Sequence, residues 1–191
     1  INGRAILHID NAYYLPNVQV QNYLCKTNTV SSTAFRGFGG NQGMMVIENI
    51  VDNISRYLNK DPSQIRKNNF YQKNKKNITH YGMKIEDNVI QEVFNKLLKK
   101  SNYKKRYLKI KKFNSNNKYL KKGIAITPVK FGISFTTIHL NQAGALVHIY
   151  TDGSVNVNHG GIEMGQGTNT KIAQLVANEL GLPFEKIKIS S

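Results

Sequence analysis

The stretch STAFRGFGGNQG, residues 32–43, decides the local fold because four of its twelve residues are glycine. Apolar residues then recur at helical spacing, at Met44, Ile47, Ile50, Val51, Ile54, Tyr57 and Leu58. This periodicity predicts a helix that begins where a glycine-rich loop ends. Such a loop presents backbone N–H groups to an anion or a polar cofactor. A helix-entry turn that only needs a permissive backbone would have the same pattern, so both interpretations stay open.

A second glycine-rich stretch, GGIEMGQG at residues 160–167, also precedes a helical pattern, which covers residues 170–180 and ends at Gly181. Neither loop has the dinucleotide-binding fingerprint, because Gln42 and Thr170 stand where a third glycine belongs. Neither has the Gly-Lys-Ser/Thr ending of a phosphate-binding loop. The loops therefore indicate no standard nucleotide site.

The remaining patterns predict an α+β fold, with helices and strands in blocks rather than in strict alternation. Asp61-Pro62 is a helix-start signal, and Gln64 can complete a capping box. A further helix is expected over 88–100, with a helix end and loop over 101–122. Residues 1–30 are expected to be extended. Strands are expected at 124–129, 133–140, 145–151 and 154–159, with a hairpin turn at 151–154 and a further strand near the end of the chain.

The net charge of +16 on 191 residues is confined to one part of the chain. Residues 56–122 carry 20 basic and 4 acidic residues, and the rest of the chain is formally neutral. A basic cluster of this kind is compatible with a nucleic-acid-binding module. The cluster is rich in Lys and Asn and lacks any recognised nucleic-acid-binding motif, which favours a solvated surface segment without a nucleic-acid partner.

Composition excludes several other classes of protein. An apolar content of 40% suffices for a core, and the single Cys25 excludes a disulfide framework and any multi-cysteine metal site. The histidines show no metal-ligand spacing and are read as satisfied strand residues; they are His8, His80, His139, His148 and His159. No apolar run approaches the roughly 20 residues of a membrane span. We expect a cytoplasmic protein without a membrane partner.

Several motifs in order resemble the molybdenum-cofactor domain of the xanthine dehydrogenase family. They are LCKT at 24–27, TAFRGFGGNQG at 33–43, FGISFT at 131–136, NQAGA at 141–145, YTDGS at 150–154 and HGGIEMGQG at 159–167. The resemblance implies that the chain is an internal fragment of the molybdopterin-binding domain. We expect the chain to divide into three parts. Residues 1–72 hold the substrate and cofactor loop with its helices, residues 73–122 are a Lys/Asn-rich surface segment, and residues 123–191 hold strands and the second cofactor loop.

The resemblance implies roles for six residues. Arg4 falls where the family has the arginine that hydrogen-bonds the purine and stabilises negative charge on it, and Phe38 where a phenylalanine packs on the purine ring. Arg36 marks the loop whose backbone lies at the molybdenum. The cofactor-contacting loop corresponds to Met164, Gly165 and Gln166. Asn41 departs from the family, which usually has proline at this position.

The family's reaction is hydroxylation of a ring carbon, which converts hypoxanthine and xanthine to urate. A general-base glutamate deprotonates a molybdenum-bound hydroxyl, which attacks the carbon while hydride passes to a sulfido ligand. Electrons then leave through 2Fe-2S clusters and FAD to NAD, on partner domains or subunits of a homo-oligomeric enzyme. That glutamate is expected beyond Ser191, and Glu163 is not it. The fragment therefore holds no catalytic residue and should be inactive alone.

Two alternatives remain beside a xanthine dehydrogenase. An aldehyde oxidase has related motifs but generally lacks the purine-directed arginine, so Arg4 favours purines. A basic nucleic-acid-binding module would use residues 56–122 and would bind with steep salt dependence.

Overall fold

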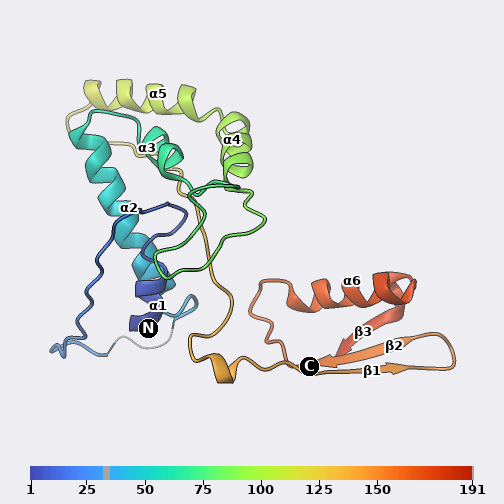
Figure 1. The fold of residues 1–191 in the computed structure, drawn as a ribbon. Coiled ribbons are helices and arrows are strands. Elements are labelled where there is room, and N and C mark those ends of the chain that lie inside the picture. Colours follow the sequence, from blue (N-terminus) through green and yellow to red (C-terminus); the bar gives the residue numbers. More distant parts are fainter. Residues whose placement is uncertain (32–34, 191) are drawn as a thin grey trace. The chain divides into compact units, whose positions relative to one another are not determined.

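The computed structural model describes residues 1–31 and 35–190. Ser32, Thr33 and Ala34 of the first glycine-rich stretch, and Ser191, lie outside the described residues. The chain forms two compact units, Ile1–Ile133 and Ser134–Ser191 (Figure 1). Each unit is described by itself below.

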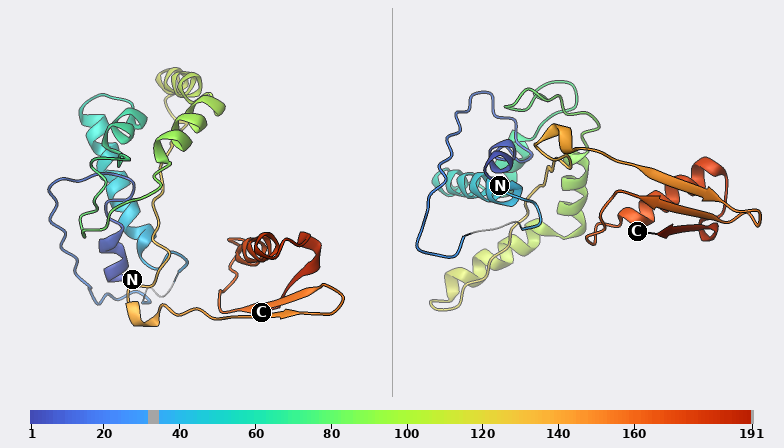
Figure 2. Two further views of the ribbon diagram at one scale, coloured as in Figure 1. Left: turned by 45° about the vertical axis from the view of Figure 1, so that its right-hand side comes forward. Right: turned by 90° about the horizontal axis from the view of Figure 1, so that it is seen from below.

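The first unit is helical and holds the larger core. Its helices are α1 (Asn2–Leu7), α2 (Gly40–Tyr57), α3 (Pro62–Asn69), α4 (Ile90–Lys100) and α5 (Tyr103–Asn116). The short α1 lies beside the N-terminal half of α2 (Figures 1 and 2). A Cβ on Gly43 of α2 would collide with the carbonyl oxygen of Ala5, so only glycine allows this close crossing. The core consists of Ala12, Tyr13, Ile47, Val51, Ile65, Phe70, Phe94, Tyr103 and Ile126.

Four of the expected helices are confirmed, three in this unit and one in the next. The helix after the first loop is α2, and the helix over 88–100 is α4. Asp61 caps α3, since its carboxylate accepts a hydrogen bond of 2.8 Å from the Ser63 N–H and Pro62 occupies the first turn. In the second unit, the helix ending at Gly181 is α6 (Thr168–Leu180), and Gly181 adopts the left-handed conformation with φ of 64°.

The first unit also corrects three expectations. Residues 2–7 form α1 rather than an extended segment, because a short apolar run suits a buried helix as well as a strand. Residues 103–116 form α5, which fits the good helix propensity of Lys and Arg. Residues 124–129 belong to no strand of the described chain, and Pro128 bonds through its carbonyl to the side chain of Asn11 at 3.0 Å.

The second unit is a three-stranded sheet with a helix on one face (Figure 2). The strands β1 (Ala145–Ile149), β2 (Val155–His159) and β3 (Ile187–Ser190) lie in that order. β1 pairs antiparallel with β2, and β2 pairs parallel with β3 through the crossover helix α6. Val155, Val157 and Ile187 pack against Ala173 and Ala177 of α6. Short 3-10 helices occupy Ile138–Leu140 and Phe184–Lys186.

The sheet confirms the hairpin and the α+β class but not every strand. The turn between β1 and β2 is held by Asp152, whose carboxylate accepts from the Ser154 N–H at 2.9 Å. The strand expected at 133–140 is wrong, since this segment is irregular and ends in a 3-10 helix. The Asn141 side chain bonds both the N–H and the carbonyl of Phe135 at 2.7 Å, which replaces strand pairing.

The helices of the described chain include none with both the length and the apolar character that crossing a bilayer requires.

Candidate functional site

Arg4, the predicted substrate residue, is buried in the first unit with 7% of its surface exposed. Its Nη2 donates a hydrogen bond to the carbonyl of Gly132, 128 residues further along the chain. Its guanidinium carbon lies 4.8 Å from the centre of the Phe131 ring, within the range of a cation–π contact. The planar guanidinium is therefore held by a ring on one side and a carbonyl at one end, and Arg4 is not an ordinary surface arginine.

His8, at the C-terminal end of α1, contacts the same residues. Its Nδ1 lies 2.8 Å from the carbonyl oxygen of Arg4, and its Nε2 accepts from the Gly132 N–H at 3.0 Å. Its ring centre is 5.1 Å from that of Phe131. Burial lowers the pKa of His8 below its ordinary value. We call the four residues Arg4, His8, Phe131 and Gly132 the arginine clamp.

The interpretation of His8 as a strand residue is wrong, although its ring is fully hydrogen-bonded as expected. The sequence signal for the clamp is the spacing of Arg4 and His8, which places both on one face of a helix once α1 is recognised. Their contact with Gly132 has no local signal, because it joins distant parts of the chain.

Buried polar side chains hold the segment that carries Phe131 and Gly132. Asn11 donates to the Pro128 carbonyl and accepts from the Lys130 N–H, each at 3.0 Å. The ammonium of Lys130 pairs with Asp10, which is fully buried and also accepts from the Tyr71 hydroxyl at 2.6 Å. Burial lowers the pKa of Lys130, against the opposing effect of Asp10. Residues 128–132 are thus fixed without belonging to a sheet.

The first glycine-rich loop places Arg36 and Phe38 at the surface just before α2. The backbone is left-handed at Gly37, Phe38 and Gly39, with φ of 100°, 50° and 103°. Asn41, the departure from the family pattern, donates from its amide to the Arg36 carbonyl at 2.8 Å and so braces the loop that proline would otherwise stiffen.

The start of α2 fits an anionic group of a cofactor. Its N-cap is Gly39, and no side chain caps this end of the 18-residue helix. The positive end of a helix dipole and its backbone N–H groups favour negative charge such as a phosphate. The residues of this loop are therefore compatible with the pterin cofactor that the resemblance implies.

In the second loop, Glu163 organises the backbone. One carboxylate oxygen accepts from the N–H groups of Gly165 at 2.8 Å and Gly167 at 3.0 Å, and the other from Asn169 at 3.1 Å. These bonds, that of Asn169 foremost, hold the pKa of Glu163 below its ordinary value. A carboxylate that is stabilised in its charged form is a poor proton acceptor. That Glu163 is not the general base stays a prediction.

Gln166 is also engaged within the loop. Its amide nitrogen donates to the Ile162 carbonyl at 2.6 Å and to the Thr168 hydroxyl at 2.7 Å, while its oxygen accepts from the Met164 N–H at 2.6 Å. Both amide hydrogens are used, so Gln166 can offer a cofactor only a lone pair of its oxygen. Met164 and Gly165 are exposed beside it.

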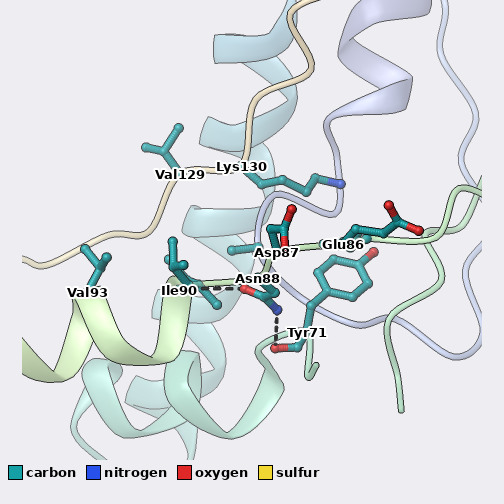
Figure 3. Close-up of a pocket in the computed structure, with 11 residues that line it drawn as sticks. Tyr71, Glu86, Asp87, Asn88, Ile90, Val93, Val129 and Lys130 are labelled. Carbon is teal, nitrogen blue, oxygen red and sulfur yellow. Dashed lines mark hydrogen bonds between the residues drawn. The ribbon is translucent and has the colours of Figure 1, made fainter. Parts of the chain in front are cut away.

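The first unit also holds a pocket of about 280 Å³ (Figure 3). Tyr71, Asn88, Val93 and Lys130 are among its lining residues. Asn88 closes one side, since its amide donates to the Tyr71 carbonyl at 2.9 Å and accepts from the Ile90 N–H at 3.1 Å. None of the six predicted site residues lines this pocket. Residues 1–31 and 35–190 contain no group of three or more side chains that could hold a metal ion.

Two family models match the chain, and both describe a molybdopterin cofactor-binding domain. One covers residues 1–70 and the other residues 96–191. The chain is 49% identical over 190 residues to a xanthine dehydrogenase/oxidase of Gallus gallus and 49% identical over 187 residues to a xanthine dehydrogenase of Dictyostelium discoideum. It is aligned over 100% and 98% of its length, and it spans 14% of the length of each of these relatives.

Solved structures show the same fold at lower identity. The aldehyde oxidoreductase of Desulfovibrio desulfuricans covers 98% of the chain with a TM-score of 0.65 and 20% identity, and the match takes up 20% of that protein. Quinoline 2-oxidoreductase of Pseudomonas putida covers 82% of the chain with a TM-score of 0.62 and 24% identity, and the match takes up 21% of that protein.

Proposed function

Because the chain belongs to the molybdopterin cofactor-binding domain family, we propose that the complete protein is a molybdenum hydroxylase that hydroxylates a ring carbon of purines such as hypoxanthine and xanthine. Identity of 49% to xanthine dehydrogenases along nearly the whole chain supports this activity. The observation that carries the choice of purines over aldehydes is the buried, oriented guanidinium of Arg4.

Arg4 serves as the group that binds the purine and stabilises the negative charge that builds on it. A guanidinium is always charged and presents its donors in a plane, which suits the carbonyl oxygen of a flat heterocycle. Preorganised donors stabilise developing charge because they need not reorient during the reaction. The exposed ring of Phe38 supplies a face on which the purine can stack.

The cofactor contacts fall on the two glycine-rich loops. The backbone at Arg36 and the start of α2 take the anionic part of the pterin, and the second loop contributes through Met164, Gly165 and the oxygen of Gln166. The molybdenum cofactor, when bound, supplies the centre that accepts two electrons from the substrate. Iron–sulfur clusters and FAD on other domains or subunits carry these electrons to NAD.

The experiment that tests this function replaces Arg4 by Met in the complete enzyme. We expect kcat/KM for hypoxanthine to fall by about 10²–10³-fold, as when one donor to a developing anion is removed. The kcat/KM for benzaldehyde should fall far less, because benzaldehyde has no second carbonyl for Arg4 to bind. Arg56→Met is the matched control, because Arg56 is exposed in the last turn of α2 and should leave both substrates unaffected.

Equal loss on both substrates in Arg4→Met would contradict the purine assignment and favour an aldehyde oxidase. Partial recovery of purine turnover in Arg4→Lys would show that charge alone supplies part of the effect, since lysine lacks the planar fork.

A further inference from the structure

The imidazole of His8 closes a ring of three hydrogen bonds with Arg4 and Gly132. The Arg4 side chain donates to the Gly132 carbonyl, and the Gly132 N–H donates to Nε2 of His8 at 3.0 Å. Nδ1 of His8 completes the ring on the Arg4 carbonyl at 2.8 Å. The side chain of Arg4 and its own backbone are thus tied to the same glycine.

The partners of His8 fix its protonation state. A carbonyl oxygen can only accept, so Nδ1 carries the hydrogen; a backbone N–H can only donate, so Nε2 offers its lone pair. The ring is therefore the neutral Nδ1–H tautomer. A proton added to Nε2 would face the Gly132 N–H and remove its acceptor.

The ring of His8 also packs tightly at the start of α2. A Cβ on Gly40 would lie 3.0 Å from the ring of Phe131 and 3.4 Å from Cγ of His8, so a larger residue at this position would have to displace one of the two rings. Gly40 directly follows the loop of Arg36 and Phe38. A displacement of His8 would therefore reach Arg4, Phe131 and the first glycine-rich loop together.

We propose that neutral His8 is a positioning residue that sets the orientation of the Arg4 guanidinium by holding Phe131 and Gly132 against it. This inference rests on the proposed function, in which Arg4 binds the purine. His8 touches neither substrate nor cofactor in this role and acts only through Arg4.

The surroundings of His8 favour its neutral form. Burial disfavours its charged form, the cations of Arg4 and Lys130 add to this, and the carboxylate of Asp10 and the bond to the Arg4 carbonyl oppose it. The pKa of His8 accordingly lies below 6.5. As pH falls through that lowered pKa, protonation breaks the bond to Gly132 and loosens the clamp.

The test compares three variants of His8 in the complete enzyme. His8→Phe keeps the ring volume and removes both hydrogen bonds. His8→Gln can still accept from the Gly132 N–H, whereas His8→Asn can still donate to the Arg4 carbonyl but cannot reach Gly132.

We expect His8→Phe and His8→Asn to lower kcat for hypoxanthine by about 10–100-fold, which is the effect of a small misplacement of the Arg4 guanidinium. Hypoxanthine should be affected at least about tenfold more than benzaldehyde, and His8→Gln should recover most of the loss.

A pH profile supplies a readout that a structural role would not change. The ratio of kcat/KM for hypoxanthine to that for benzaldehyde cancels ionisations that both reactions share. In the unchanged enzyme this ratio should decline as pH falls below 6.5 toward the lowered pKa of His8. In His8→Gln it should stay flat. A ratio that declines equally in both enzymes overturns the proposal.

The Arg4→Met background separates the two hypotheses. If His8 acts through Arg4, His8→Phe added to Arg4→Met should cause no further selective loss. Selective loss in Arg4→Met together with equal loss on both substrates in His8→Phe and His8→Asn would overturn the role of His8 and leave the proposed function standing. Absence of selectivity in Arg4→Met would overturn both. If His8→Phe does not fold, the same outcomes are read from His8→Asn.

Discussion

Glu163 shows how one exposed carboxylate can order a glycine-rich loop. Its two oxygens accept hydrogen bonds from three backbone N–H groups, those of Gly165, Gly167 and Asn169. Asn169 belongs to the first turn of α6. Negative charge at a helix N-terminus also interacts favourably with the helix dipole. The loop therefore obtains its shape from a side chain within it.

We predict that Glu163→Ala accelerates hydrogen–deuterium exchange at the amides of Gly165, Gly167 and Asn169. The pKa of Glu163 is lowered in the folded chain, so its contribution is present above about 4.5 and is lost as pH falls through the lower folded value. Acidification of the unchanged protein should thus lower the protection of the same amides, measured as exchange relative to the intrinsic rate at each pH. Glu179→Ala, an exposed change near the other end of α6, is the control. Unchanged exchange in Glu163→Ala would show that glycine backbone preferences alone set the loop.

The candidate site could be predicted from the sequence only in part. Arg4 and Phe38 were identified by resemblance, and no local pattern places Gly132 beside Arg4, since 128 residues separate them. The hydrogen bonds of Gln166 likewise depend on the loop conformation, which glycines at 165 and 167 leave open in the sequence. Tertiary contacts therefore determine the part of the site that spacing cannot reveal.

Arg66 joins α3 to α2. Its side chain is 2% exposed and donates to Glu48 at 2.7 Å and to Asp52 at 2.8 Å. Glu48 also accepts from Asn11 at 2.9 Å and from the Tyr13 hydroxyl at 2.5 Å. The ion pair of Arg66 and Glu48 therefore links α2 and α3 to the segment that follows α1.

We predict that Arg66→Met lowers the free energy of unfolding by about 3–5 kcal/mol, because it leaves the largely buried carboxylate of Glu48 without its cation. Urea denaturation followed by circular dichroism measures this loss. Arg56→Met, an exposed arginine of α2, should change stability by less than about 0.5 kcal/mol. A loss of similar size in both variants would mean that the ion pair contributes little beyond net charge.

Elements with strong local signals could be predicted from the sequence, whereas those whose partners lie far along the chain could not. α2 and α3 follow a glycine-rich loop and an Asp-Pro start, and these signals predict both helices. For α1 and for the segment at 124–129 the expectation of a strand is wrong, because apolar runs of five or six residues do not distinguish a strand from a buried helix or a tethered coil.

The sheet of the second unit is covered by α6 only in part. Val147 and Ile149 of β1 pair with Val157 and Val155, so their side chains share the face that α6 packs on. They are nevertheless 45% and 63% exposed. Apolar residues on an edge strand favour association with another chain.

We predict that the 191-residue polypeptide, expressed alone, self-associates through this edge. Val147→Lys combined with Ile149→Lys should shift it toward monomer in sedimentation velocity, because charge on an edge strand opposes pairing. His148→Lys adds charge on the opposite face of the same strand and serves as the control. Equal dissociation by His148→Lys would attribute the effect to net charge rather than to the apolar row.

The tie between Arg4 and Gly132 also sets an order of events during synthesis. α1 leaves the ribosome before its partner, which follows 128 residues later. At about 5–20 residues per second, Arg4 waits roughly 6–25 seconds before its environment exists. Throughout that interval a cationic, partly apolar helix must stay accessible without pairing elsewhere, so chaperone protection of the nascent α1 segment bears directly on whether a competent site forms.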